Sequence, residues 1–259
     1  MQPVSAVIPA AGRGTRLAPL TPTVPKELLP LGRRPAIYWT LREAAEAGLH
    51  EACVVVSPTK PALVEVLRRL DGRHELPRIK LAFQEEPLGL GDAIARARDF
   101  TGDGWFAILL PDNLFWGEGP AVAGLLEPHR RTGRAMAGLL DPARDFDPRH
   151  SSASYQHLAP GPAEGLFRVT GMDKPAPGER DPDQTYLGIG RYILPPEFHD
   201  CVEAVRQRVT GELGDIEALR RLLESHEILA TCVPGLRYDL GTWGGYEAAF
   251  RRLAREAIE

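Results

Sequence analysis

The sequence has few cysteines, no long apolar run and no excess of basic residues, and each shortage excludes a class of protein. Its three cysteines, Cys53, Cys201 and Cys232, lack metal-type spacing and are expected to be buried, reduced thiols. A membrane-spanning helix needs about 18 consecutive apolar residues, and no such run is present. The formal net charge of −4 gives no basic surface for nucleic acid or an anionic membrane. We therefore expect a cytoplasmic protein with no signal peptide, membrane span or nucleic-acid partner.

The arrangement of apolar residues predicts an α/β fold. Runs of strand length alternate with helical patterns, which is typical of βα units around a mostly parallel sheet. A chain of 259 residues is long enough for one large domain, so we expect a single domain over residues 1–259. The predicted strands are 4–8, 52–56, 79–83, 105–110, 135–140, 186–194 and 228–233. The predicted helices are 36–47, 61–70, 90–98, 120–131, 195–209, 215–225 and 242–257.

The stretch from residue 141 to residue 184 differs from the rest of the chain. Turn-forming residues dominate 141–148, and short strand patterns then alternate with Pro and Gly. We interpret this stretch as a small β-rich insertion that carries one wall of a site.

A glycine-containing turn after the first predicted strand indicates a site for phosphate groups. The run 10–16 (AAGRGTR) follows the apolar segment 6–8, and Pro25-Lys26-Glu27 comes shortly after it. Glycines let backbone N–H groups approach an anion closely, and nearby cations supply charge to hold it. The spacing excludes a dinucleotide fingerprint, because Leu17 stands where a third glycine is needed, and the Lys-Ser/Thr pair of a P-loop is absent.

Two segments resemble the signature of the sugar-1-phosphate nucleotidyltransferases. They are the run 11–17 (AGRGTRL) and the run 25–30 (PKELLP). The resemblance extends over nearly the whole chain and implies a Rossmann-like (GT-A-type) domain, with a mixed, mostly parallel sheet flanked by helices. It implies that Arg16 holds the departing pyrophosphate and that Lys26 contacts phosphate oxygens. The nucleotide-binding loop it implies consists of Ala10, Ala11, Gly12, Gly14 and Thr15.

The same resemblance assigns the nucleobase to the segment 84–91 (QEEPLGLG). There Gln84 corresponds to the glutamine that reads the base, and Gly89 to a close backbone contact. An amide suits this role because it offers a donor and an acceptor side by side, which match the imide edge of uracil or thymine.

Two aspartates are the expected ligands of Mg²⁺. Asp112 follows an apolar strand, where open α/β sheets place ligand-binding groups. The resemblance makes Asp112 a magnesium ligand and adds Asp239 in the turn YDLGTW as the second. Two carboxylates plus phosphate oxygens form the hard-oxygen set that Mg²⁺ prefers.

The sugar side matches the family less closely. Lys174 is expected to bridge the two reacting phosphates, and Asp173 to hold sugar hydroxyls, although the family has a longer glutamate at that position. Tyr192, in the run GIGRY, is a further candidate for sugar binding. The segment 153–157 lacks the glycine that the family usually has on this wall.

The resemblance implies transfer of a uridylyl group from UTP to glucose 1-phosphate, with Mg²⁺ as cofactor and pyrophosphate as the second product. A short segment before Gln84 and the altered sugar wall keep two alternatives open: dTTP as the nucleotide, or another sugar. A third alternative is a catalytically silent nucleotide-sugar binding protein, against which the intact charged residues argue. The resemblance also leaves a homo-oligomer open.

Overall fold

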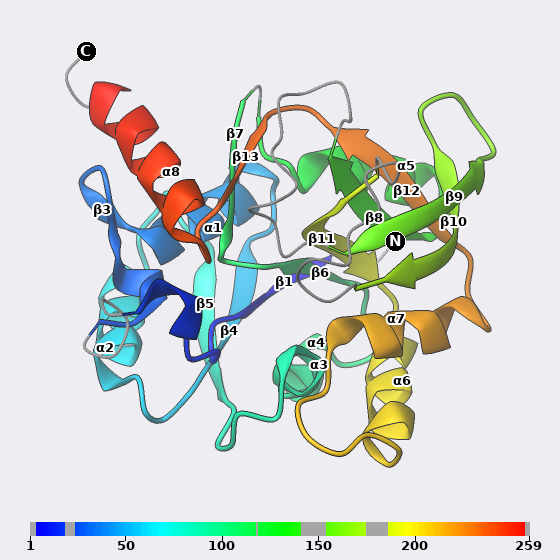
Figure 1. Ribbon diagram of the computed structural model, residues 1–259, viewed down its shortest axis with the longest axis horizontal. Helices are drawn as coiled ribbons and strands as arrows, with labels where there is room; N and C mark the ends of the chain where they lie inside the picture. The colour runs from blue at the N-terminus through cyan, green and yellow to red at the C-terminus, as the bar shows by residue number, and fades with distance from the viewer. Residues whose placement is uncertain (1–3, 19–23, 118, 141–153, 175–185, 257–259) are drawn as a thin grey trace.

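The protein is organised around one mixed sheet, seen in a computed structural model that describes residues 4–18, 24–117, 119–140, 154–174 and 186–256 (Figure 1). The nine-stranded sheet has the order β5-β4-β1-β6-β11-β8-β12-β10-β9. All its strands run in one direction except β11 and β10. The strands are β1 (Ser5–Pro9), β4 (Glu51–Val56), β5 (Arg78–Phe83), β6 (Phe106–Leu109), β8 (Ala135–Leu140), β9 (Tyr155–Pro160), β10 (Phe167–Asp173), β11 (Gly188–Leu194) and β12 (Ile228–Val233).

Helices cover both faces of this sheet. In β1, Ala6 and Ile8 pack into one buried cluster, whereas Val7 packs into another on the opposite face. Strands buried on both faces read as continuous apolar runs, which is why the sequence revealed them. The first cluster is covered by α1 (Ala36–Glu46), α2 (Pro61–Leu70) and α5 (Ala123–Thr132). The second is covered by α3 (Leu90–Ala95), α6 (Glu197–Arg206) and α7 (Asp215–Leu223).

A small ribbon and the closing helix form a third layer beside the sheet. β7 (Asn113–Trp116) pairs antiparallel with β13 (Leu236–Asp239). Helix α8 (Trp243–Glu256) buries Ala249 and Leu253 against the ribbon and against β2 (Pro30–Leu31). β2 itself pairs with β3 (Arg34–Pro35). Short 3₁₀ turns, η1 (Thr15–Leu17) and η2 (Lys26–Leu28), and the one-turn helix α4 (Arg98–Thr101) complete the described elements.

The structure confirms the predicted α/β class and corrects some boundaries. The predicted helix 90–98 is two helices, α3 and α4, and the ribbon strands β7 and β13 were not predicted. The part of the expected insertion that is described, 154–174, forms the β9–β10 hairpin, and β10 pairs with β12, so the hairpin continues the main sheet. Residues 141–153 and 175–184 of the expected insertion lie outside the described residues. In the described parts of the chain, no helix combines the length and the apolar character needed to cross a membrane.

Candidate active site

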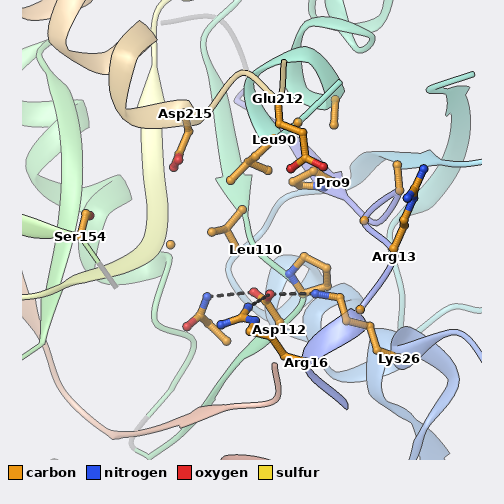
Figure 2. A pocket seen from close by; sticks show the side chains of 18 of the residues that line it. Pro9, Arg13, Arg16, Lys26, Leu90, Leu110, Asp112, Ser154, Glu212 and Asp215 are labelled. Carbon is orange, nitrogen blue, oxygen red and sulfur yellow. Dashed lines mark hydrogen bonds and ion pairs between the residues drawn. The ribbon is translucent and has the colours of Figure 1, made fainter. Parts of the chain in front are cut away.

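A cavity of about 430 Å³ lies at the carboxyl ends of β1, β5 and β6 (Figure 2). Open α/β sheets place their ligands at this edge. Most of the sequence-predicted site residues line it: Ala11, Gly12, Gly14, Thr15, Arg16, Lys26, Gln84, Gly89, Asp112, Lys174 and Tyr192. Ala10, Asp173 and Asp239 are not among the lining residues. Figure 2 shows Asp215 and Ser154 on one side of the cavity and Arg13 and Lys26 across from them.

The glycine loop is held from beneath by a buried lysine, Lys60. Its Nζ donates hydrogen bonds to the carbonyl oxygens of Ala10 at 2.7 Å and Gly12 at 2.6 Å, and it pairs with the Glu27 carboxylate at 2.9 Å. Burial lowers the pKa of Lys60, while Glu27 opposes this shift. Lys60 thus fixes the inner side of the loop through the carbonyl oxygens of Ala10 and Gly12. The sequence did not single out Lys60, although it follows a strand end in the run SPTK.

Two cationic side chains of the cavity, Lys26 and Arg16, lie next to the Asp112 carboxylate. Lys26 Nζ lies 2.8 Å from Asp112 Oδ2, and Arg16 Nη2 lies 4.0 Å from the same oxygen. Burial alone would raise the pKa of Asp112, but the charge and hydrogen bond of Lys26, with Arg16 and Arg237, lower it to about 2. Burial would likewise lower the pKa of Lys26, but Asp112 and Glu27 outweigh it and raise that pKa. The pair is therefore fully ionised at neutral pH.

The turn that carries Asp112 is fixed by a buried arginine. Arg191 is fully buried, and its guanidinium donates to the carbonyl oxygens of Leu110 at 3.0 Å and Asn113 at 2.7 Å. The same guanidinium pairs with the Glu43 carboxylate at 2.6 Å. Arg191 therefore holds the backbone on both sides of Asp112.

The backbone at Asp239 lies beside the backbone at Asp112, but the two carboxylates have different hydrogen-bond and ion-pair partners. Asp239 pairs in register with Asn113, and Leu240 N donates to Asp112 O at 2.7 Å. Asp239 Oδ1 accepts from Gly241 N at 3.0 Å, and Oδ2 lies 3.6 Å from Arg237 Nη2. Arg237 lines the cavity and was not predicted, although residues two apart on a strand share a face.

The donor chemistry around Asp112 fits a magnesium ion held largely by substrate phosphates. Mg²⁺ is commonly bound through one or two carboxylates plus phosphate oxygens and waters. Asp112 supplies one carboxylate inside the cavity, and Asp239, next to Leu240 whose N–H donates to Asp112 O, is the second candidate. Among the residues that the structure describes, no cluster of three or more His, Cys, Asp or Glu is suited to a metal.

Gln84 and Gly89 both line the cavity and contact each other. Gln84 Nε2 donates to Gly89 O at 2.9 Å and to the buried carboxylate of Asp92 at 2.8 Å. Gly89 has a φ of +98°, and a Cβ there would lie 2.3 Å from Leu213 O. Gln84 and Gly89, which were both predicted as site residues, therefore lie next to each other in the cavity. Asp92 was not predicted, because an aspartate in the first turn of a helix is common and does not by itself indicate a site.

The sugar side combines predicted and unpredicted residues. Lys174 and Tyr192 line the cavity, but the Asp173 carboxylate bonds to His157 and Arg220, and the His157 bond is the main cause of its lowered pKa. Sugar binding by Asp173 thus stays a prediction. Asp215, which the sequence placed in no role, lines the cavity, and burial raises its pKa while Lys174 opposes this.

Known proteins are similar to this chain over nearly its whole length. A family model described as Nucleotidyl transferase matches residues 5–256. A protein from Mycoplasma pneumoniae named UTP–glucose-1-phosphate uridylyltransferase is 33% identical over 276 residues, 98% of this chain and 94% of that protein. A Bacillus subtilis protein of the same name is 30% identical over 261 residues, 93% of this chain and 87% of that protein.

Solved structures of UDP-glucose pyrophosphorylases are similar to this protein in fold over nearly the whole chain. A crystal structure of UDP-glucose pyrophosphorylase complexed with UDP-glucose has a TM-score of 0.85 at 24% identity, over 98% of this chain and 100% of that chain. A UTP-bound UGPase from Acinetobacter baumannii has a TM-score of 0.80 at 25% identity, over 98% and 97% of the two chains. The fold class expected from the sequence is confirmed. With a family match over residues 5–256, the chain belongs to the nucleotidyl transferase family.

Proposed function

We propose that this protein transfers a uridylyl group from UTP to glucose 1-phosphate, giving UDP-glucose and pyrophosphate. The observation that carries the proposal is the cluster of Lys26, Arg16 and Asp112 beside a glycine loop, at the edge of the sheet where ligands bind. The relatives named UTP–glucose-1-phosphate uridylyltransferase support this choice of substrates. Both substrates are phosphorylated metabolites, so we place the enzyme in the cytoplasm.

The reaction needs charge and alignment rather than a general base. A phosphate oxygen of glucose 1-phosphate attacks the α-phosphorus of UTP, and the bond from that phosphorus to the pyrophosphate oxygen breaks. The nucleophile is already an anion at neutral pH, so the barrier comes from repulsion between anions and from their alignment. Lys174 would neutralise the two reacting phosphates, while Arg16 and Lys26 would stabilise the departing pyrophosphate.

The remaining predicted residues would bind and orient the two substrates. Residues 11–15 would present backbone N–H groups to the triphosphate, and Ala10, whose N–H donates to Val55 O at 2.7 Å, would hold the start of the loop. Gln84 and Gly89 would contact the base. Tyr192 and Asp173 are the proposed sugar contacts.

Asp112, with Asp239, would hold Mg²⁺. When bound, the ion supplies positive charge to the phosphate oxygens during transfer. Formation of the complex would require Lys26 to exchange its contact with Asp112 for substrate phosphate, which its position on the cavity wall allows.

The test is release of pyrophosphate from glucose 1-phosphate and Mg²⁺, with UTP, dTTP, CTP, GTP and ATP compared in parallel. We expect the highest kcat/KM with UTP. A preference for dTTP would reassign the nucleotide. No release with any triphosphate and any common sugar 1-phosphate would favour a silent nucleotide-sugar binding protein.

A further inference from the structure

The amide of Gln84 can face the cavity in only one orientation. Its Nε2 contacts two oxygens, Gly89 O at 2.9 Å and Asp92 Oδ2 at 2.8 Å. A carbonyl and a carboxylate both accept hydrogen bonds, so the group that faces them must be the NH₂ of the amide. Both its hydrogens are then used. Gln84 lines the cavity, and its Oε1 accepts no hydrogen bond from any residue in the described part of the chain.

Asp92 is itself held as a carboxylate. Its side chain is fully buried, and Arg96 Nη2 lies 2.9 Å from Oδ1 while Arg206 from α6 also pairs with Oδ1. Arg96 Nε donates to Oδ2, the oxygen that also accepts from Gln84. Burial would raise the pKa of Asp92, but the hydrogen bonds from Arg96 and Gln84 and the two arginine charges lower it. Asp92 therefore accepts hydrogen bonds and does not donate them.

We propose that Asp92 is a positioning residue that sets base specificity: it locks the Gln84 amide so that only a carbonyl oxygen faces the nucleobase. This inference rests on the proposed function, in which Gln84 contacts the base. An acceptor-only group selects a pyrimidine with an N–H at ring position 3, as in uracil and thymine. Cytosine presents a lone pair there, and two acceptors facing each other leave both unpaired.

An amide locked by Asp92 distinguishes uracil from cytosine better than an amide that is free to rotate. A free amide could meet uracil through its oxygen or cytosine through its NH₂ group. The carboxylate of Asp92 removes the second choice without touching the substrate. A purely structural Asp92, joining α3 to α6 through its arginines, would leave the ratio between UTP and CTP unchanged.

The decisive variant is Asp92→Asn. An asparagine is neutral and has one oxygen for the four donors that surround Asp92, so its hold on the Gln84 NH₂ weakens. We expect the ratio of kcat/KM for UTP to that for CTP to fall about tenfold or more, with the KM for glucose 1-phosphate little changed. An unchanged ratio in a folded variant overturns the proposal.

Thr101→Val is the matched control. Thr101 is buried in α4 and bonds to His199 of α6 at 2.9 Å, so its loss weakens the packing of the neighbouring helix α4 on α6 without contacting Gln84. We expect it to lower the unfolding temperature and to keep the UTP/CTP ratio. A ratio that falls equally in the control would assign the effect to packing and overturn the proposal.

If Asp92→Asn fails to fold, the activity of the unmodified protein with 4-thio-UTP tests whether the Gln84 oxygen contacts the N3–H of the base. 4-Thio-UTP keeps the N3–H but replaces O4 with a weak acceptor, whereas CTP lacks the N3–H. Activity with 4-thio-UTP near that with UTP, and far above that with CTP, is expected; 4-thio-UTP as poor as CTP overturns the proposal. If no triphosphate reacts, the proposed function fails, and calorimetric binding of UDP against CDP then tests the orientation of Gln84 by itself.

Discussion

At the scale of single residues, Lys26 lies closer to Asp112 than Arg16 does, at 2.8 Å against 4.0 Å, and is proposed to stabilise the departing pyrophosphate. Lys26→Met removes its charge while keeping most of its volume. We expect kcat for pyrophosphate release to fall about 10²-fold, the loss typical of one missing charge-stabilising group. Lys80→Met is the control, because Lys80 is an exposed lysine on β5 away from the cavity. Full turnover in Lys26→Met would refute the role given to this residue.

The same ion pair makes stability depend on pH in a defined range. The pKa of Asp112 is about 2 in the folded protein, below its ordinary value of 3.8. Ionised Asp112 therefore stabilises the fold at and above about pH 4, by about 2 kcal/mol, and this contribution is lost as the pH falls from about 4 to about 2.

Lys26→Met tests this dependence through the free energy of unfolding. Lys26 contributes the largest effects that lower the pKa of Asp112, so without it this pKa rises. The variant should be less stable than the parent at pH 7, and the difference should narrow towards pH 2. Urea denaturation across this range measures both curves; curves that stay parallel would contradict the coupling.

At the scale of elements, the glycine loop and the start of α3 each depend on one close contact. Lys60 binds two carbonyls of the loop and pairs with Glu27, so Lys60→Met leaves a buried carboxylate without its partner. We expect a loss of about 3 kcal/mol in stability and about a tenfold increase in KM for UTP. The KM for glucose 1-phosphate should change much less.

The double variant Lys60→Met/Glu27→Gln separates the two roles of Lys60. Removing the buried charge of Glu27 should return part of the stability, because no uncompensated carboxylate remains. It should not restore the KM for UTP, because the carbonyls of Ala10 and Gly12 still lack their donor. Recovery of both quantities would assign Lys60 to stability alone.

The entry into α3 gives a steric prediction. Gly89 has a positive φ, and an added Cβ would overlap the backbone oxygen of Leu213 at 2.3 Å. Gly48 has a similar φ of +80° with open space around it. Gly48→Ala should therefore cost about 1 kcal/mol from backbone strain, and Gly89→Ala about 2 kcal/mol more from the overlap. Thermal unfolding measures both, and equal losses would exclude the close contact.

Elements with a local signal were predictable from the sequence, and those formed by distant pairing were not. α2, β8 and β12 occupy their predicted ranges because their apolar periodicity is set within each segment. β7 and β13 consist of four residues each, and they form only because positions near 113 and 239 meet. The site divides in the same way. Motif residues such as Lys26 and Asp112 were predicted, while Lys60 and Asp92 act through partners that no sequence spacing reveals.

At the scale of the whole molecule, one buried guanidinium joins elements that are far apart in the sequence. Arg191 on β11 binds Glu43 of α1 and the carbonyls on both sides of Asp112, and Glu43 also accepts from Val122 N before α5. The two partners are 148 residues apart. This network ties β11, α1 and the start of α5 to the turn that carries the proposed metal ligand.

Arg191→Met should therefore weaken both the fold and the chemistry. The uncompensated Glu43 should cost about 3–5 kcal/mol of unfolding free energy, and the loosened turn should lower kcat more than it raises KM for UTP. Arg168→Met removes a half-exposed arginine paired with Glu227 and should cost about 1 kcal/mol or less. A further variant, Arg191→Met/Glu43→Leu, removes both buried charges and should regain stability. Its kcat should stay low, because the carbonyls of Leu110 and Asn113 would still lack their donor; a kcat restored with stability would show that Asp112 is positioned without Arg191.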